Sequence, residues 1–105
     1  MVDAVLNALL TDAKLRLRLH TDAFNDEIKD LIQAAAGDLL YRNAIQPSQL
    51  ESTPVDPLIK RAILTYVRAY FGTPEDPERL KADYDEQKAT LMMTSGFTEW
   101  GETNG

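Results

Sequence analysis

Two Asp-Pro pairs constrain the fold of this chain more than any other feature of the sequence. In Asp56-Pro57 and Asp76-Pro77 the aspartate can cap a helix, and the proline suits the first helical position because it has no N–H group that needs a partner. Gly72, which lies between the pairs, favours the end of a helix. The pairs therefore predict two consecutive helices, of which the second continues to about Met93.

Apolar residues at helical spacing extend this pattern toward the N-terminus. One such segment covers about residues 3–15, and another runs from a cap at Thr21 or Asp22 to about Arg42. Between them, leucine alternates with arginine over residues 15–19, which predicts a short extended connector because a single strand has no partner.

The whole pattern predicts an all-α fold. We expect a small bundle of about four helices, with a long loop between helices 2 and 3 at residues 46–55, where two prolines and two serines gather, and an extended C-terminal tail. A chain of 105 residues has room for one core. We therefore expect a single helical domain at residues 1–95, followed by a docking tail at residues 96–105.

The last helix has a narrow apolar stripe. Leu80, Tyr84 and Leu91 form it, with Gln87 between them. A stripe of this width usually meets a single partner helix rather than a deep core. The sequence leaves open whether that partner lies in the same chain or in a neighbouring copy.

Composition excludes several classes of protein. The chain has no cysteine and one histidine, so it holds no disulfide, no thiolate or multi-histidine metal site and no cysteine nucleophile. No glycine-rich phosphate loop or nucleophile elbow is present. We therefore expect neither an enzyme nor a cofactor. No apolar run reaches the roughly 18–20 residues of a membrane span, and an acid at position 3 is unlike a signal peptide, so we expect a soluble, unprocessed protein.

The remaining candidates for acid–base or metal chemistry are few. His20 has Asp22 as its only local carboxylate, and we expect a surface or capping histidine rather than a general base. Carboxylates also share a helical face at Asp26 and Asp30, and at Asp83 and Glu86, but no Glu-x-x-His motif accompanies them. We expect these pairs to be solvated helix faces.

The helix that follows Pro57 is basic. Lys60, Arg61 and Arg68 carry all of its charge, which raises the question of nucleic-acid binding. A recognition helix normally begins with residues that read bases, whereas this one begins Pro57-Leu58-Ile59. We expect ion pairs with the acidic second or fourth helix instead.

The C-terminal segment places two aromatic residues in a polar, glycine-flanked end. Phe97 and Trp100 are of the type that anchors protein interfaces. They suggest docking on another protein, although Trp100 folding back on its own domain is the alternative.

Three stretches, taken in order, resemble a known family: the small helical head–tail connector (adaptor, or head-completion) proteins of tailed bacteriophages and prophages. The order and spacing of the three stretches carry the resemblance, which spans about residues 14–100. The stretches are Lys14-Leu15-Arg16-Leu17-Arg18-Leu19 with the acidic-started helix after it, Val55-Asp56-Pro57-Leu58-Ile59-Lys60-Arg61-Ala62-Ile63 through Tyr70-Phe71-Gly72, and Glu75-Asp76-Pro77-Glu78-Arg79 with Tyr84 and the ending Leu91 to Phe97-Thr98.

The resemblance implies a structural protein of the virion neck, made in the bacterial host cytoplasm and involved in DNA packaging and ejection. It implies a dodecameric ring that binds the portal protein, extends the DNA channel and seats a downstream head-completion or tail protein. By analogy, Phe97, Thr98, Glu99 and Trp100 would dock on the portal. Leu80, Tyr84 and Leu91 would then supply one face of a ring interface.

The net charge of −6 agrees with a channel that double-stranded DNA passes through without specific binding, since an acidic lumen repels the phosphates. Asp83 and Glu86 are the residues that we expect to face this channel. The alternative function is a small helical regulatory or DNA-binding module, which would bind DNA in a salt-sensitive way.

Overall fold

The two Asp-Pro pairs begin helices where the sequence predicts them. In the computed structural model, Oδ1 of Asp56 accepts a hydrogen bond from the backbone N–H of Leu58 at 2.8 Å, and Oδ1 of Asp76 accepts one from the N–H of Arg79 at 3.3 Å. These contacts satisfy amide groups that the first turn of a helix leaves without partners.

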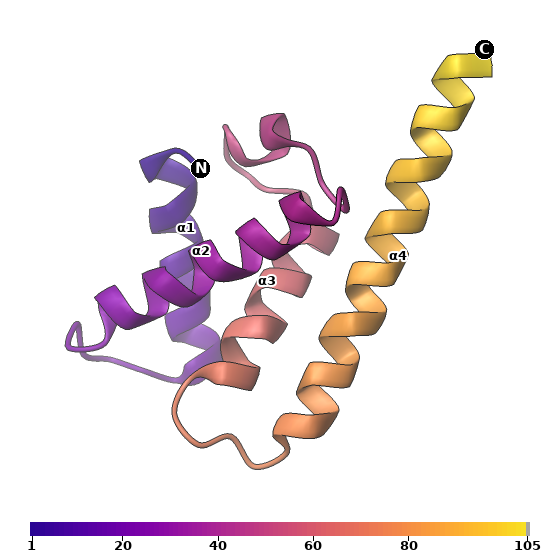
Figure 1. Ribbon diagram of the computed structural model, residues 1–105. Helices are drawn as coiled ribbons and strands as arrows, with labels where there is room; N and C mark the ends of the chain where they lie inside the picture. Colours follow the sequence, from indigo (N-terminus) through magenta and orange to yellow (C-terminus); the bar gives the residue numbers. More distant parts are fainter. Residues whose placement is uncertain (105) are drawn as a thin grey trace.

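The structure describes the backbone of residues 1–104 and the side chains of residues 1–94. The elements in this part of the chain are four α-helices and one short 3₁₀ helix (Figure 1). They are α1 (Asp3–Leu17), α2 (Asn25–Tyr41), η1 (Pro47–Leu50), α3 (Pro57–Tyr70) and α4 (Pro77–Asn104). No strand occurs in the described backbone, so the all-α fold of about four helices is confirmed, as is the long loop between α2 and α3.

The predicted extended connector at residues 15–19 is wrong in its first part, because α1 continues to Leu17. The helix ends with Arg18 in the left-handed region at φ 57°. The N–H of Leu19 then donates to the carbonyl of Lys14 at 2.9 Å, and the N–H of Arg18 to that of Leu15 at 3.2 Å, which is the Schellman arrangement. Leu15 is exposed, while Leu17 and Leu19 pack against the core. The alternating leucines therefore belong to the end of a helix and not to an extended segment.

One hydrophobic core lies mainly between α1, α2 and α3, with α3 at its centre, and α4 joins it through Tyr84 and Leu91. Ile59, Ile63 and Val67 of α3 are almost fully buried against apolar residues of α1 and α2. The contributing residues of those two helices include Val5, Leu9, Ile28, Ile32 and Leu39. The loop joins this core through Leu50 and Val55, which explains why a polar, proline-containing segment is held against the body.

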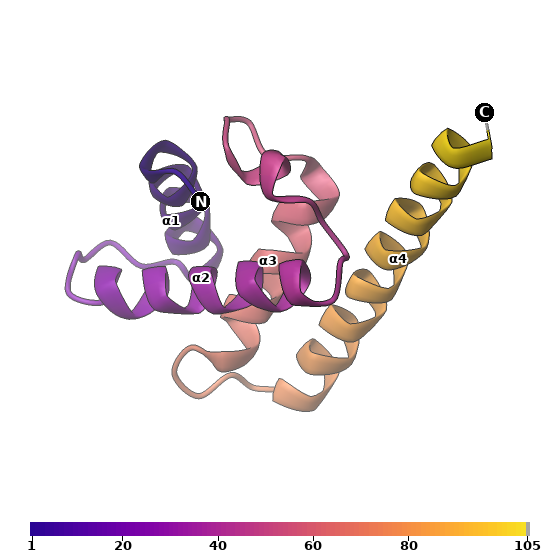
Figure 2. The ribbon, with the colours of Figure 1, turned by 45° about the horizontal axis from the view of Figure 1, so that its top comes forward.

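Helix α4 runs alongside α3 and continues beyond the rest of the molecule (Figure 1). Its C-terminal part projects away from α1, α2 and α3 in both views (Figure 2), and the molecule measures 49 × 30 × 19 Å along its principal axes. The projecting part is the extended C-terminal segment that the sequence predicts. Its backbone is helical, however, and α4 does not end near Met93. Gly96 and Gly101 lie within it, and each glycine disfavours a helix by only about 1 kcal/mol.

Candidate functional site

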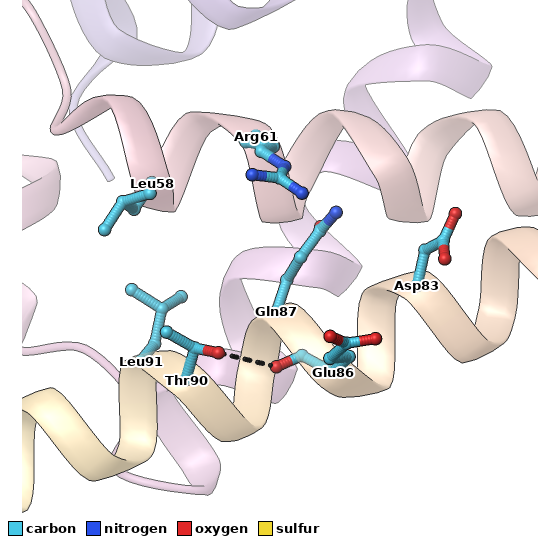
Figure 3. Close-up of a pocket in the computed structure, with 7 residues that line it drawn as sticks. All are labelled: Leu58, Arg61, Asp83, Glu86, Gln87, Thr90 and Leu91. Carbon is cyan, nitrogen blue, oxygen red and sulfur yellow. Dashed lines mark hydrogen bonds between the residues drawn. The ribbon is translucent and has the colours of Figure 1, made fainter.

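A groove lies between α3 and α4 on one flank of their contact (Figure 3). Leu58 and Arg61 line it from α3, and residues of α4 line the opposite side. The residues from α4 are Asp83, Glu86, Gln87, Thr90 and Leu91. The groove holds about 270 Å³ and is open to solvent along its length.

The two carboxylates expected to face a DNA channel lie together at this groove. Asp83 is half-buried and Glu86 is exposed, and Arg61 lies across from them on α3 (Figure 3). No ion pair joins them to Arg61 in the part of the chain whose side chains are described. Between them, the side-chain oxygen of Gln87 is buried without a hydrogen-bond partner. The groove therefore offers an unsatisfied acceptor between opposite charges.

Basic residues from two helices gather next to the groove. A hollow beside it is lined by Arg16 at the end of α1 and by Arg61 and Arg68 of α3, and a second hollow adds Arg18. We call these four residues the arginine surface. All four are exposed, and within residues 1–94 none of them makes a side-chain hydrogen bond or an ion pair. Four cations thus lie together without an ion pair among the described residues, although acidic side chains also line the hollows.

The ion pairs predicted between α3 and the acidic helices α2 and α4 do not form among the described residues. Lys60 pairs with Asp12 of α1 at 3.4 Å, and Arg61 and Arg68 have no partner there. The physical reason is the direction of the side chains. The face of α3 that meets α2 is apolar, and the arginines occupy the face that points away from α2.

A polar contact on the other flank joins α2 to α4. The Tyr84 hydroxyl donates to Oδ2 of Asp38 at 2.6 Å, and Nζ of Lys88 donates to the same oxygen at 2.9 Å. Partial burial by itself raises the pKa of Asp38, but the hydrogen bonds from Tyr84 and Lys88 outweigh it, and the pKa lies below its ordinary value. Burial and the bond to Asp38 raise the pKa of Tyr84. The contact therefore holds a charged carboxylate between two helices.

The three residues expected to form a ring interface lie inside their own chain. Leu80, Tyr84 and Leu91 are 6%, 4% and 7% exposed, and they pack α4 onto α3. The ring of Tyr84 meets that of Tyr66 edge-on, with centroids 5.1 Å apart. Within this chain the partner of the narrow stripe is thus α3, while Leu80 and Leu91 also line the hollows and the groove at the edges of the contact.

The candidate acid–base and metal residues do not converge. His20 is exposed, and Asp22 accepts a hydrogen bond from Nζ of Lys14 at 2.6 Å, which lowers the pKa of Asp22. Asp26 and Asp30 are exposed on α2. Within the described residues, no three acidic or histidine side chains are placed to hold a metal ion. None of the helices there is both long and apolar enough to cross a bilayer.

Comparison with known proteins decides the family. The family model for the phage connector protein matches residues 9–98, which include most of α1, all of α2 and α3, and α4 up to its last turns. This chain belongs to the phage connector protein family. No curated protein and no solved structure matches it.

Membership gives this connector a structural role in the phage neck, as the resemblance of the sequence implied. The candidate docking residues Phe97, Thr98, Glu99 and Trp100 lie outside the residues whose side chains the structure describes. The structure adds two features that the sequence did not indicate: the uncompensated arginine surface and the contact between Asp38, Tyr84 and Lys88. Only the spacing of Arg61 and Arg68 on one helical face was visible beforehand.

Proposed function

We propose that this connector forms a dodecameric ring beneath the portal protein, extends the DNA channel, and seats a downstream head-completion or tail protein. The observation that carries the proposal is the match of residues 9–98, nearly the whole folded body, to the phage connector family. A ring formed from one small chain requires a heterologous contact that closes on itself.

The C-terminal part of α4 supports the proposed contact with the portal. It projects from the body (Figure 1), so a partner can bind it without disturbing the core between α1, α2 and α3. In this proposal Phe97, Thr98, Glu99 and Trp100 dock on the portal, and the aromatic residues supply most of the binding energy.

The charge of the chain supports passage of DNA without specific binding. The net charge of −6, repeated around a ring, produces a strongly negative collar. In this proposal the outer edge of α4 faces the channel, with Glu86 in the lumen and Asp83 at its border. Negative side chains at this position repel the phosphates of passing DNA, which then slides.

Truncation tests the contact with the portal. A chain that ends at Ser95 lacks the proposed docking residues and should no longer be captured by immobilised portal protein, while its thermal unfolding midpoint stays within about 2 °C of the full chain. The variant Trp100→Ala should weaken capture at least about tenfold. Met93→Ala is the matched control, because Met93 is 76% exposed and lies just before the segment. Unchanged capture by the truncated chain refutes the assignment.

Duplex-DNA binding separates this function from the alternative. The arginine surface is the observation that favours a small DNA-binding or regulatory module. Such a module would be a stable monomer or dimer with salt-sensitive affinity for DNA. The connector should instead assemble and show no micromolar affinity for duplex DNA at low salt. Light scattering coupled to size-exclusion chromatography, followed by filter binding, distinguishes the two.

A further inference from the structure

Two charged surfaces of opposite sign remain uncompensated in the described part of the chain. The arginine surface is one of them. The other lies on the first two turns of α2, where Asp26, Glu27 and Asp30 are exposed and make no side-chain ion pair within residues 1–94. Clusters of like charge repel one another, so each surface is more favourable against an opposite charge than in isolation.

No ion pair joins the two surfaces within residues 1–94 of one chain. The hollows at the arginine surface are lined by α1, α3, α4 and the loop before α4, and no residue of α2 lines them. Figures 1 and 2 show α2 crossing α3. Two surfaces of opposite charge that do not pair within one protomer are suited to a head-to-tail contact between identical copies.

The exposed face of α2 also carries two small residues. Behind Asp30 along the helix lie Gln33, Ala34 and Gly37, all exposed at helical spacing. A Cβ atom built at Gly37 would meet nothing within 4 Å, so packing inside the chain does not require a glycine there. A glycine inside a helix is about 1 kcal/mol less favourable than alanine, and close approach by another copy provides a reason for it.

The arginine surface has a further feature beside its charge. Leu58 is 49% exposed at the neighbouring groove. An exposed apolar side chain beside a cluster of cations is a combination that a protein partner can cover.

We propose that the acidic face of α2, centred on Asp26, Glu27 and Asp30, binds the arginine surface of the next copy, and that this is the heterologous contact that closes the ring. The inference rests on the proposed function and places the contact between copies outside the stripe of Leu80, Tyr84 and Leu91, which is largely covered by its own chain. The next copy, rather than DNA, is the partner because the carboxylates of α2 supply charges complementary to the four arginines, whereas a chain of net charge −6 repels duplex DNA as a whole.

Reciprocal charge reversal tests the contact. Arg68→Glu places acid against acid between identical copies, and Asp30→Arg places base against base. Each variant alone should raise the protein concentration at half-assembly at least about tenfold, and low salt should enlarge the effect. An equimolar mixture should recover assembly, because copies that alternate around the ring always pair opposite charges. Both residues are exposed, so the thermal unfolding midpoint of each variant should stay unchanged.

Matched reversals outside both surfaces serve as controls. Glu51→Arg changes an exposed acid in the loop before α3, and Lys81→Glu changes a base on the other flank of α4. Neither should alter assembly. Cross-linking gives a second readout, since the chain has no cysteine of its own. A short bis-maleimide should join Arg68→Cys to Asp30→Cys only when the two variants are mixed.

Assembly is measured for the chain alone and with portal protein, and the cross-linking is performed in whichever sample assembles. Assembly that survives both single reversals, or cross-links that do not form in it, overturns this interface and leaves the proposed function standing. If Arg68→Glu lowers the binding of duplex DNA to the filter while assembly is unchanged, the proposed interface is also overturned, and the arginine surface is assigned to DNA binding. Absence of assembly in both samples refutes the proposed ring, and the inference with it.

Discussion

The body formed by α1, α2 and α3 differs from α4 in how it is held. Helix α3 is surrounded, and its apolar residues Ile59, Ile63 and Val67 are almost fully buried. Helix α4 is attached along one side only, through a narrow stripe and one polar contact with α2. The difference indicates that the body provides stability, whereas α4 and the outer surfaces are free to serve partners.

The largest effect is expected in the body. Ile63→Ala removes a side chain that is 0% exposed at the centre of the core and should lower the free energy of unfolding by about 2–5 kcal/mol. Urea denaturation followed by circular dichroism measures it. A loss below about 1 kcal/mol would mean that the core is not centred on α3.

A smaller effect is expected where α4 meets α3. Leu91→Ala removes a side chain that is 7% exposed near the far end of the contact, and it should lower the free energy of unfolding by about 2 kcal/mol, because solvent reaches the vacated space. Limited proteolysis should then cut α4 before it cuts the body. Equal protection of both regions would contradict the distinction between them.

The polar contact between α2 and α4 should contribute less and depend on pH. Asp38→Asn weakens the bonds from Tyr84 and Lys88 and should lower the free energy of unfolding by about 1–2 kcal/mol at pH 7. The folded pKa of Asp38 is below its unfolded value, so the stabilisation is complete above the unfolded value of about 4 and is lost as the pH falls through the folded pKa. The wild type and the variant should therefore converge in acid.

Asp85→Asn is the control for that experiment. Asp85 lies 3.9 Å from the same lysine but is 73% exposed, so its removal should change the free energy of unfolding little at any pH. If Asp85→Asn reproduced the effect of Asp38→Asn, the contact with α2 would not be what secures α4.

The smallest effect on stability is expected at the arginine surface. Arg68 has no partner within the described residues, so Arg68→Glu should change the free energy of unfolding by no more than about 0.5 kcal/mol, even though it prevents assembly. Thermal denaturation of the unassembled protein measures it. A loss of more than about 1 kcal/mol in the free energy of unfolding would support the internal ion pairs that the sequence predicted.

The helices could be predicted from interactions between residues close in the sequence, whereas the contacts at the candidate site depend on residues far apart in the sequence. The Asp-Pro pairs place the starts of α3 and α4 because a cap acts within three residues. The apolar stripe at Leu80, Tyr84 and Leu91 was equally visible, but spacing does not tell whether α3 of the same chain or another copy covers it. The bond from Tyr84 to Asp38 spans 46 residues of sequence, and no local pattern indicates it.

Charge misled the sequence interpretation at α3 for a related reason. An acidic chain with a basic helix suggests internal neutralisation, yet Arg61 and Arg68 point away from α2, and only Lys60 finds a partner in α1. The direction of a side chain follows from which face of the helix is buried. That face was predictable for α3, but the position of α2 relative to it was not.

The mass of the complex with the portal tests the central claim most directly. Purified portal protein is mixed with an excess of this chain, and native mass spectrometry determines how many copies bind. We expect a complete ring with one copy per portal subunit, formed by the full chain and not by the chain that ends at Ser95. A chain that remains at its monomer mass of 11.8 kDa in the presence of portal protein would contradict the account.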